Sequence, residues 1–309
     1  MNILVTGGAG YVGSTLVPML LQEGHKVRVY DNLLFGGRGL LPCFTNRNFE
    51  LVVGDTRDEQ GLKKVLQDID LVIHLAAIVG YPACKKDERL ADEVNHKATV
   101  LLEKMRNRDV PIFFASTGSN YGALIGDLCT EETPLNPLTV YGKTKTAAEQ
   151  HLLEKGNVVC YRFATAFGVS NRMRLDLLIN DFVYQAVKNR NLIVYEKTFK
   201  RTFIHVSDMA RAFIFAINNI DKMRDNVYNI GSDNMNWSKE QVARKIKEKI
   251  EYYLHFAEFG TDEDKRNYEV SYEKISALGY GTTVTVEEGI DELIQAVQVI
   301  EIKNEFSNV

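Results

Sequence analysis

Short apolar runs alternate with longer amphipathic stretches along the first half of the chain. Runs rich in β-branched and aromatic residues predict buried strands over residues 3–5, 26–30, 49–53, 71–74, 112–115 and 158–163. Between these runs apolar residues recur every three or four positions, as at Val12, Leu16 and Leu20, which is typical of helices. Strands that alternate with helices in this way predict an α/β fold built on a doubly wound parallel sheet.

The second half of the chain is less regular and predicts a smaller C-terminal α/β lobe. Helical spacing recurs over residues 207–219, 238–250 and 286–300. We expect a first domain over residues 1–167 and a second over 168–309, with 203–231 packing back on the first. In the first domain, apolar residues from Leu90 to Met105 fall on one face and predict a single long helix.

A glycine-rich stretch, Thr6–Gly13, lies between the first strand and the first helix. On its own, such a stretch can be a tight turn that needs glycine. A strand, a glycine loop and a helix in this order also form the site where the pyrophosphate of a dinucleotide meets the amides of a helix N-terminus. Asp31 ends the second strand, where a carboxylate accepts from the ribose hydroxyls of NAD and repels the extra phosphate of NADP. The sequence therefore predicts NAD as the cofactor.

Tyr141 and Lys145 are four residues apart in a stretch predicted to be helical, so both side chains share one face. The pKa of a free tyrosine side chain is about 10 and that of lysine about 10.4, so neither group alone is a useful base at neutral pH. An adjacent ammonium favours the phenolate and lowers the pKa of the tyrosine, which makes Tyr141 a usable general base. A Tyr-x-x-x-Lys pair also occurs by chance on surface helices. It indicates a catalytic role here only because the same half of the chain carries the glycine-rich loop.

Composition narrows the classes of partner. The chain has 309 residues and a net charge of −4, which argues against nonspecific electrostatic binding to nucleic acid or to an acidic membrane. Its four cysteines are scattered without a C-x-x-C pair, so we expect no metal site and no disulfide framework. No apolar run approaches the ~20 residues that cross a bilayer, and no signal peptide is expected. We expect a cytoplasmic protein with no nucleic-acid or membrane partner.

The motifs resemble those of the extended short-chain dehydrogenase/reductase family, the NAD-dependent nucleotide-sugar epimerases and dehydratases, which carry a Rossmann domain. The resemblance spans nearly the whole chain and rests on residues 6–13, 31–32, 54–55, 74–77, 141–145 and 201–206. A narrower similarity, over residues 168–180 and 264–268, is to the GDP-mannoheptose 4-dehydrogenases and related epimerases of surface-polysaccharide pathways.

The resemblance implies a role for each matching residue. Tyr141 would take a proton from a sugar hydroxyl at C4 while hydride leaves that carbon for nicotinamide, Thr117 would bond the reacting oxygen, and Lys145 would bind the nicotinamide ribose. The residues implied to hold NAD are Gly7, Gly10, Tyr11, Val12, Gly13, Asp31, Asn32, Asp55, Thr56, Leu75, Ala76, Ala77 and Lys145. Those expected to hold a nucleoside-diphosphate sugar are Val79, Ser119, Asn120, Arg172, Arg174, Asn180, Arg201 and Arg266. The four arginines suit a diphosphate, although solvated or ion-paired surface arginines are the alternative.

One departure from the family pattern bears on the reaction. Family members that are 4,6-dehydratases place an acidic pair directly after the catalytic threonine, whereas Gly118 and Ser119 stand here. We therefore expect NAD-dependent oxidation at C4 of a nucleoside-diphosphate sugar, a GDP-heptose or a hexose, by a 4-dehydrogenase or 4-epimerase of surface-polysaccharide biosynthesis. The alternative is a regulatory protein that binds NAD or a nucleotide sugar without catalysis. By resemblance we also expect a homodimer.

Overall fold

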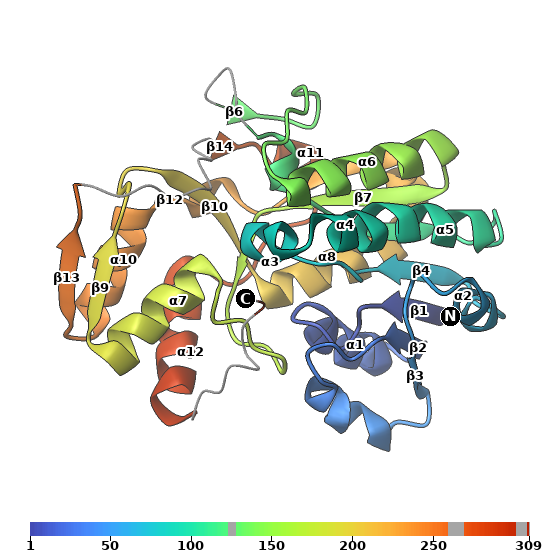
Figure 1. The fold of residues 1–309 in the computed structure, drawn as a ribbon, viewed down its shortest axis with the longest axis horizontal. Coiled ribbons are helices and arrows are strands. Elements are labelled where there is room, and N and C mark those ends of the chain that lie inside the picture. The colour runs from blue at the N-terminus through green and yellow to red at the C-terminus, as the bar shows by residue number, and fades with distance from the viewer. Residues whose placement is uncertain (123–127, 259–268, 301–307, 309) are drawn as a thin grey trace.

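The computed structural model describes residues 1–122, 128–258, 269–300 and 308 of the chain. Within those residues, seven parallel strands form a central sheet in the spatial order β11–β7–β5–β4–β1–β2–β3 (Figure 1). The strands are β1 (Asn2–Thr6), β2 (Lys26–Asp31), β3 (Phe49–Val53), β4 (Leu71–His74), β5 (Ile112–Thr117), β7 (Val158–Phe163) and β11 (Asn226–Ile230). The chain moves outward from β1 to β3, then crosses to β4 and moves outward the other way. This is the predicted doubly wound sheet, and its switch point lies between β1 and β4.

Helices cover both faces of this sheet, because alternate residues of each strand point to opposite sides. Ile3 and Val5 pack into one buried cluster, whereas Leu4 between them packs into another. The helices are α1 (Gly13–Gln22) and α8 (Val206–Asn218) at the first cluster, and α2 (Glu59–Val65), α5 (Ala98–Met105) and α6 (Val140–Lys155) at the second. The carboxyl ends of the strands are thereby left as the edge where a ligand can bind.

The predicted long helix from Leu90 to Met105 is interrupted by a wider turn. Its parts are α4 (Glu88–Asp92), a π-helical turn (Glu93–Lys97) and α5, and the short helix α3 (Tyr81–Lys86) precedes them. The π-helical turn carries the buried Asn95, which accepts from Ile78 N at 2.7 Å and donates to Ile78 O at 3.0 Å. The turn therefore fixes the backbone that follows β4. Turns of this kind are frequent at functional sites.

The second lobe has a buried core of its own. Its elements are β8 (Thr165–Phe167), α7 (Leu178–Tyr184), β9 (Asn191–Val194), β10 (Lys200–His205), β12 (Asn236–Ser238), α10 (Lys239–Lys249), β13 (Tyr253–Phe256) and α12 (Val286–Val299). β10 lies between β8 and β12, and β9 pairs with β13. Four short elements are α9 (Ile220–Met223), β6 (Leu128–Cys129), β14 (Glu269–Val270) and α11 (Glu273–Ser276).

The chain returns to the first lobe after β10. α8 contacts α1, and β11 pairs in parallel with β7 at the edge of the central sheet. β10 itself stays in the sheet of the second lobe, where it pairs with β8. The return thus begins with α8 at Val206. The division of the chain into an NAD-binding domain and a substrate lobe stays a prediction.

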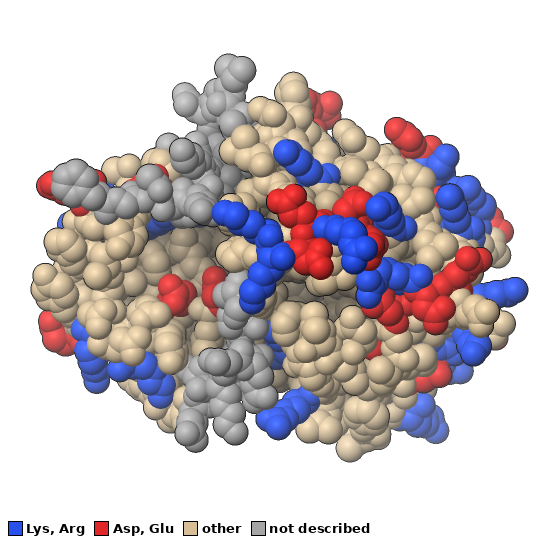
Figure 2. Space-filling view, viewed as in Figure 1, with Lys and Arg blue, Asp and Glu red and all other residues tan. Residues whose placement is uncertain are grey.

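The surface carries charges of both signs. On the face shown in Figure 2, Lys and Arg are interspersed with Asp and Glu and form no single basic field. Arg57, for example, lies 2.8 Å from Asp55 and 3.2 Å from Glu93. Across the part of the chain that the structure describes, no helix has the length and apolar character to cross a membrane. The same part contains no group of three or more His, Cys, Asp or Glu that could hold a metal ion.

Candidate active site

The glycine-rich loop brings its backbone against the end of β4. Gly7 has a φ of +71°, and a Cβ there would lie 2.6 Å from the backbone nitrogen of Ala76. A Cβ at Gly13 would lie 2.5 Å from the Cα of Gly8. A side chain at either position would collide with backbone, so glycine is required at both. The loop can then present its amides, together with the N-terminus of α1, to a bound anion.

Asp31 ends β2 beside this loop. Its carboxylate accepts a hydrogen bond from Ala9 N at 3.0 Å and another from Leu33 N at 2.8 Å. Burial raises the pKa of this carboxyl, and the two backbone donors oppose the rise. Each carboxylate oxygen has a second lone pair with which to accept from a ribose hydroxyl.

A cavity of about 460 Å³ runs along the carboxyl ends of the strands and across the switch point. Its volume is within the range of small-molecule sites. All the residues expected to hold NAD line it: Gly7, Gly10, Tyr11, Val12, Gly13, Asp31, Asn32, Asp55, Thr56, Leu75, Ala76, Ala77 and Lys145. The structure therefore gathers these residues in one place, while their individual contacts with the cofactor stay predictions.

Thr117 and Tyr141 line the same cavity as Lys145. Thr117 is the last residue of β5, and its hydroxyl accepts from the backbone N of Ser119 at 3.1 Å and donates to Ser119 Oγ at 3.2 Å. Tyr141 lies in the first turn of α6, which is capped by the Thr139 side chain accepting from Gly142 N. The Thr117 hydroxyl, held at the end of β5, and the Tyr141 phenol, held in the first turn of α6, therefore line the same cavity.

Lys145 is only 2% exposed, and its ammonium lies 3.8 Å from the centre of the Phe114 ring. Burial lowers the pKa of the amine from 10.5 to about 7, and this outweighs the opposing effect of nearby acidic groups such as Glu149. The amine therefore changes its charge near neutral pH. A titratable group poised in this range, in a cavity beside a phenol, is suited to proton transfer.

A buried ion pair supports α6 from behind the cavity. Glu149 Oε1 lies 2.6 Å from an Arg162 nitrogen, and Ser116 and Asn120 donate to Oε2. Sequence reasoning did not single out this pair. A signal was present, because Glu149 follows Lys145 by four residues and so shares its face of the helix. Its partner Arg162 lies outside the helix, on β7, so helical spacing could not identify it.

The residues expected to hold the nucleotide sugar fall into two groups in the structure, those that line the cavity and those that do not. Val79, Ser119, Arg172 and Arg174 line the cavity, Asn120, Asn180 and Arg201 do not, and Arg266 lies outside the described residues. The four that line the cavity remain candidates for substrate contact.

Asn120 and Asn180 are held by contacts within the chain, and their predicted contact with the substrate stays a prediction. The Asn120 amide is fully buried beneath the cavity and donates to Ser116 and Glu149. The Asn180 amide is also fully buried, where it accepts from Gly168 N at 3.0 Å and donates to the carbonyl of Arg174 at 2.8 Å. The Asn120 side chain thus holds other side chains, whereas the Asn180 side chain holds the backbone beside the cavity.

Arg201 lies in β10, is 4% exposed and donates to the Lys200 carbonyl at 3.1 Å. It is therefore no solvated surface arginine, and its place outside the cavity lining leaves its predicted contact with a diphosphate as a proposal.

His74 and Cys84, near the cavity, are held in the core. The His74 ring lies 2.6 Å from Thr6 Oγ1 and 3.0 Å from Thr99 Oγ1, and burial lowers the pKa of the imidazole to about 3. Cys84 donates to the Ile78 carbonyl at 3.2 Å, and burial raises the pKa of its thiol to about 11. At neutral pH the His74 imidazole is uncharged and hydrogen-bonded, and the Cys84 thiol is protonated. Neither group is suited to proton transfer, so Tyr141 remains the candidate.

Comparison with known proteins places the chain in a family. It matches the model of the NAD dependent epimerase/dehydratase family over residues 3–231. It is 33% identical to a UDP-glucose 4-epimerase of Halalkalibacterium halodurans over 274 residues, or 80% of each chain. It is 30% identical to a UDP-glucose 4-epimerase of Corynebacterium glutamicum over 275 residues, again 80% of each chain.

A solved structure agrees with these relatives. A UDP-glucuronic acid 4-epimerase from Bacillus cereus, in complex with UDP-glucuronic acid and NAD, matches with a TM-score of 0.85 and 26% identity. The match covers 96% of this chain and 99% of that one. The glycine positions that admit no Cβ and the Asp31 carboxylate at the end of β2 fit a bound dinucleotide. The chain therefore belongs to the NAD-dependent epimerase/dehydratase family, the extended short-chain dehydrogenases/reductases, and is an enzyme that uses NAD and acts on a nucleotide sugar.

Proposed function

We propose that the enzyme oxidises C4 of a nucleoside-diphosphate sugar, as a 4-epimerase or a 4-dehydrogenase. The observation that carries this proposal is that Thr117, Tyr141 and Lys145 line one cavity with the glycine-rich loop. Gly118 and Ser119 follow Thr117, so the acidic pair of the 4,6-dehydratases is missing. A protein that only senses nucleotides needs no such proton relay, which disfavours the non-catalytic alternative.

NAD, when bound, supplies a carbon that accepts hydride. Tyr141 removes the proton from the C4 hydroxyl as general base, and Thr117 orients that hydroxyl through its own, which Ser119 holds in place. Lys145, when protonated, favours the phenolate form of Tyr141. These residues serve the oxidation alike in an epimerase, which reduces the ketone again on its other face, and in a dehydrogenase, which releases it.

For the substrate we propose a GDP-heptose, in surface-polysaccharide biosynthesis. The support is the similarity of residues 168–180 to the GDP-mannoheptose 4-dehydrogenases and their epimerase relatives. UDP-hexoses are the competing class, because the relatives above are named for UDP-sugars. Arg174 and Arg201 are the proposed partners of the substrate diphosphate, since a guanidinium binds phosphate through two parallel hydrogen bonds.

The test is to incubate the NAD-loaded enzyme separately with GDP-mannoheptose, UDP-glucose and UDP-galactose. The near-ultraviolet absorbance of reduced nicotinamide is followed, and C4 stereochemistry is read by NMR. A lasting signal that a keto-acid acceptor discharges indicates a 4-dehydrogenase, whereas a flat signal with inversion at C4 indicates an epimerase. Turnover of a UDP-hexose alone would overturn the GDP-heptose assignment. No change with any sugar would favour the non-catalytic binder.

We further propose that the enzyme works in the cytoplasm as a homodimer. The support is the family's common use of the two helices that α5 and α6 represent here, which contact each other along one face of the sheet. Light scattering should give about twice the chain mass of 35.0 kDa. A mass equal to one chain at micromolar concentration would contradict the dimer.

A further inference from the structure

Two arginines on the segment after β8 line the cavity, but they are held differently. Arg174 is paired within the chain, with a guanidinium nitrogen 2.5 Å from the Asp176 carboxylate. Arg172 is 5% exposed, and its Nε and one Nη are buried without a hydrogen-bond partner among the described residues. A buried charged group with unused donors is costly unless an anion completes it. The structure thus points to an anion that binds beside Arg172.

The surroundings of Arg172 place it at the cofactor end of the cavity. Its backbone N donates to Ser14 Oγ at 3.1 Å, in the first turn of α1. Its guanidinium lies 4.2 Å from the centre of the Phe35 ring, on the loop after Asp31. A Cβ at Gly39, in the 3-10 helix Arg38–Thr45 that follows this loop, would lie 3.2 Å from the backbone N of Arg172. The arginine therefore comes from the second lobe but sits between the start of α1 and the chain that follows β2.

The position of Arg174 is different. A Cβ at Gly80 would lie 3.8 Å from its Nη2, so this guanidinium faces the loop after β4. The two arginines, only two residues apart, thus have different neighbours in the cavity. Burial, together with the charge of Arg174, lowers the pKa of Arg172 to about 10, against the opposing effect of Asp176 and Asp31. The Arg172 guanidinium still carries its charge at neutral pH.

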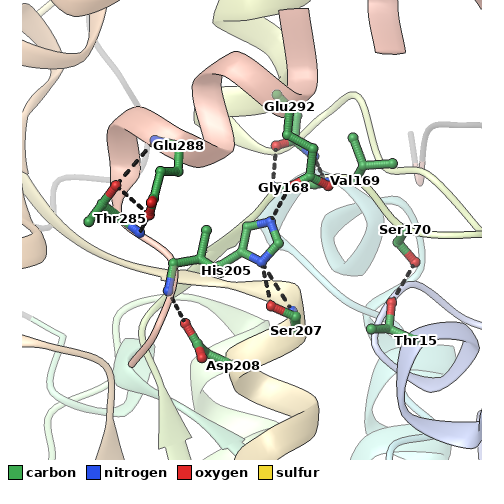
Figure 3. Close-up of polar contacts among 12 residues, drawn as sticks. Thr15, Gly168, Val169, Ser170, His205, Ser207, Asp208, Thr285, Glu288 and Glu292 are labelled. Carbon is green, nitrogen blue, oxygen red and sulfur yellow. Dashed lines mark hydrogen bonds and ion pairs between the residues drawn. The ribbon is translucent and has the colours of Figure 1, made fainter. Parts of the chain in front are cut away.

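The segment that presents this arginine is fixed by contacts with both lobes (Figure 3). The backbone N of Val169 donates to Glu292 at 3.0 Å, and the other carboxylate oxygen of Glu292 lies 2.9 Å from the His205 ring. On the opposite side, Thr15 of α1 donates to the Ser170 hydroxyl at 3.2 Å. The backbone that carries Arg172 is therefore fixed on both sides. A fixed backbone holds the arginine in position before an ion binds, which lowers the cost of ordering it.

We propose that Arg172 binds the pyrophosphate of NAD, so that the second lobe clamps the cofactor. This differs from the expectation that Arg172 holds the diphosphate of the sugar nucleotide. The inference concerns cofactor retention and does not depend on which sugar is oxidised. The oxidised and reduced forms of the cofactor carry the same pyrophosphate, so the clamp acts on both.

The test measures binding to cofactor-stripped protein by calorimetry, without substrate turnover. The ligands are NAD, ADP-ribose, adenosine and GDP, and the variants are Arg172→Gln and Arg172→Lys, with Arg174→Gln as the matched control. Arg172→Gln should raise the dissociation constants of NAD and ADP-ribose by about 10-fold or more, because a charge-assisted contact with phosphate is lost. Adenosine, which has no phosphate, should bind as before, and GDP should bind to Arg172→Gln as to the wild type. Arg174→Gln should leave NAD binding within about 2-fold.

Two outcomes would overturn the proposal. Unchanged NAD affinity with weakened GDP binding in Arg172→Gln would assign the arginine to the sugar nucleotide. Unchanged affinity for both would show that it holds neither diphosphate. Arg172→Lys keeps the charge and most of the aliphatic stem, so it gives the answer if the Gln variant fails to fold. It should weaken NAD less than Gln does but more than the control, because lysine lacks the planar fork. Since no turnover is measured, failure of this proposal is distinct from failure of the proposed C4 chemistry.

Discussion

The Glu149 carboxylate and the Arg162 guanidinium form a buried ion pair behind the wall of the active-site cavity, 2.6 Å apart at their closest atoms. The two side chains are 1% and 5% exposed. The pair joins α6, which carries Tyr141, to β7 of the central sheet. Because Ser116 and Asn120 also donate to this carboxylate, its hydrogen-bonding capacity is well used, which is the condition under which a buried pair is tolerated.

Removing the charge of Glu149 should therefore be costly. Glu149→Gln leaves the Arg162 charge buried and unpaired, and we expect the free energy of unfolding to fall by roughly 2–4 kcal/mol. Urea denaturation measures this loss. The matched control is Asp291→Asn, which breaks an exposed pair with Lys249 at 2.6 Å and should cost less than about 1 kcal/mol. Equal losses in the two variants would refute the structural role given to Glu149.

Tyr141→Phe should lower turnover by roughly two to four orders of magnitude, because the general base is lost. NAD should bind as tightly as before, since the phenol is proposed to act on the sugar. Initial rates and cofactor titration check the two parts. Tyr253→Phe, on an exposed residue of β13, is the control and should change neither. Unchanged turnover in Tyr141→Phe would remove this residue as the base.

The buried amine of Lys145 should make stability depend on pH. Its pKa is 10.5 as a free group and about 7 in the folded protein, so between these values the unfolded chain binds more protons than the folded one. The Lys145 contribution to the free energy of unfolding therefore rises with pH across this window. Lys145→Met removes that contribution, so at pH 6 the cofactor-free variant should be more stable than the wild type by roughly 2–4 kcal/mol. The difference should shrink as the pH approaches 10. A difference that does not vary with pH would contradict the burial argument.

Gly7→Ala should destabilise the protein and weaken NAD, because the new Cβ would meet the Ala76 backbone at 2.6 Å. We expect a loss of roughly 2–4 kcal/mol from strain and overlap together. Gly24→Ala is the matched control, since Gly24 also has a positive φ, of +81°, but a Cβ there meets nothing within 4 Å. It should cost about 1 kcal/mol, from backbone strain alone. Thermal or urea unfolding of both variants decides whether the close approach matters.

The sequence was sufficient for six of the seven central strands, because each of the six contains a short apolar run. The edge strand β11 was missed, because asparagines are interspersed with its apolar residues. The π-helical turn at Glu93–Lys97 could not be predicted, because its cause is tertiary. Asn95 reaches from that turn to the backbone of Ile78, a contact that no local pattern contains. The small sheets of the second lobe were missed for a related reason, since most of their strands have only three or four residues and carry little periodic signal.

The candidate site shows the same division. Its cofactor side was predictable, because the glycine-rich loop and Asp31 belong to one continuous strand–loop–helix–strand unit. The substrate side was harder, because Asn180 and Arg172 come from a segment whose course depends on contacts with α1 and α12. Spacing alone could not tell a side chain that lines the cavity from one that braces its backbone.

The most direct measurement of the central claim is the fate of deuterium placed at C4 of the nucleotide sugar. The enzyme, loaded with NAD, is incubated with the labelled sugar in ordinary water, and the label is located by NMR and mass spectrometry. Oxidation at C4 by hydride transfer predicts that deuterium stays on carbon, either at the inverted C4 of the product or on the reduced nicotinamide. Deuterium released to water, with solvent hydrogen at C4, would mean that the carbon is deprotonated and would contradict the account.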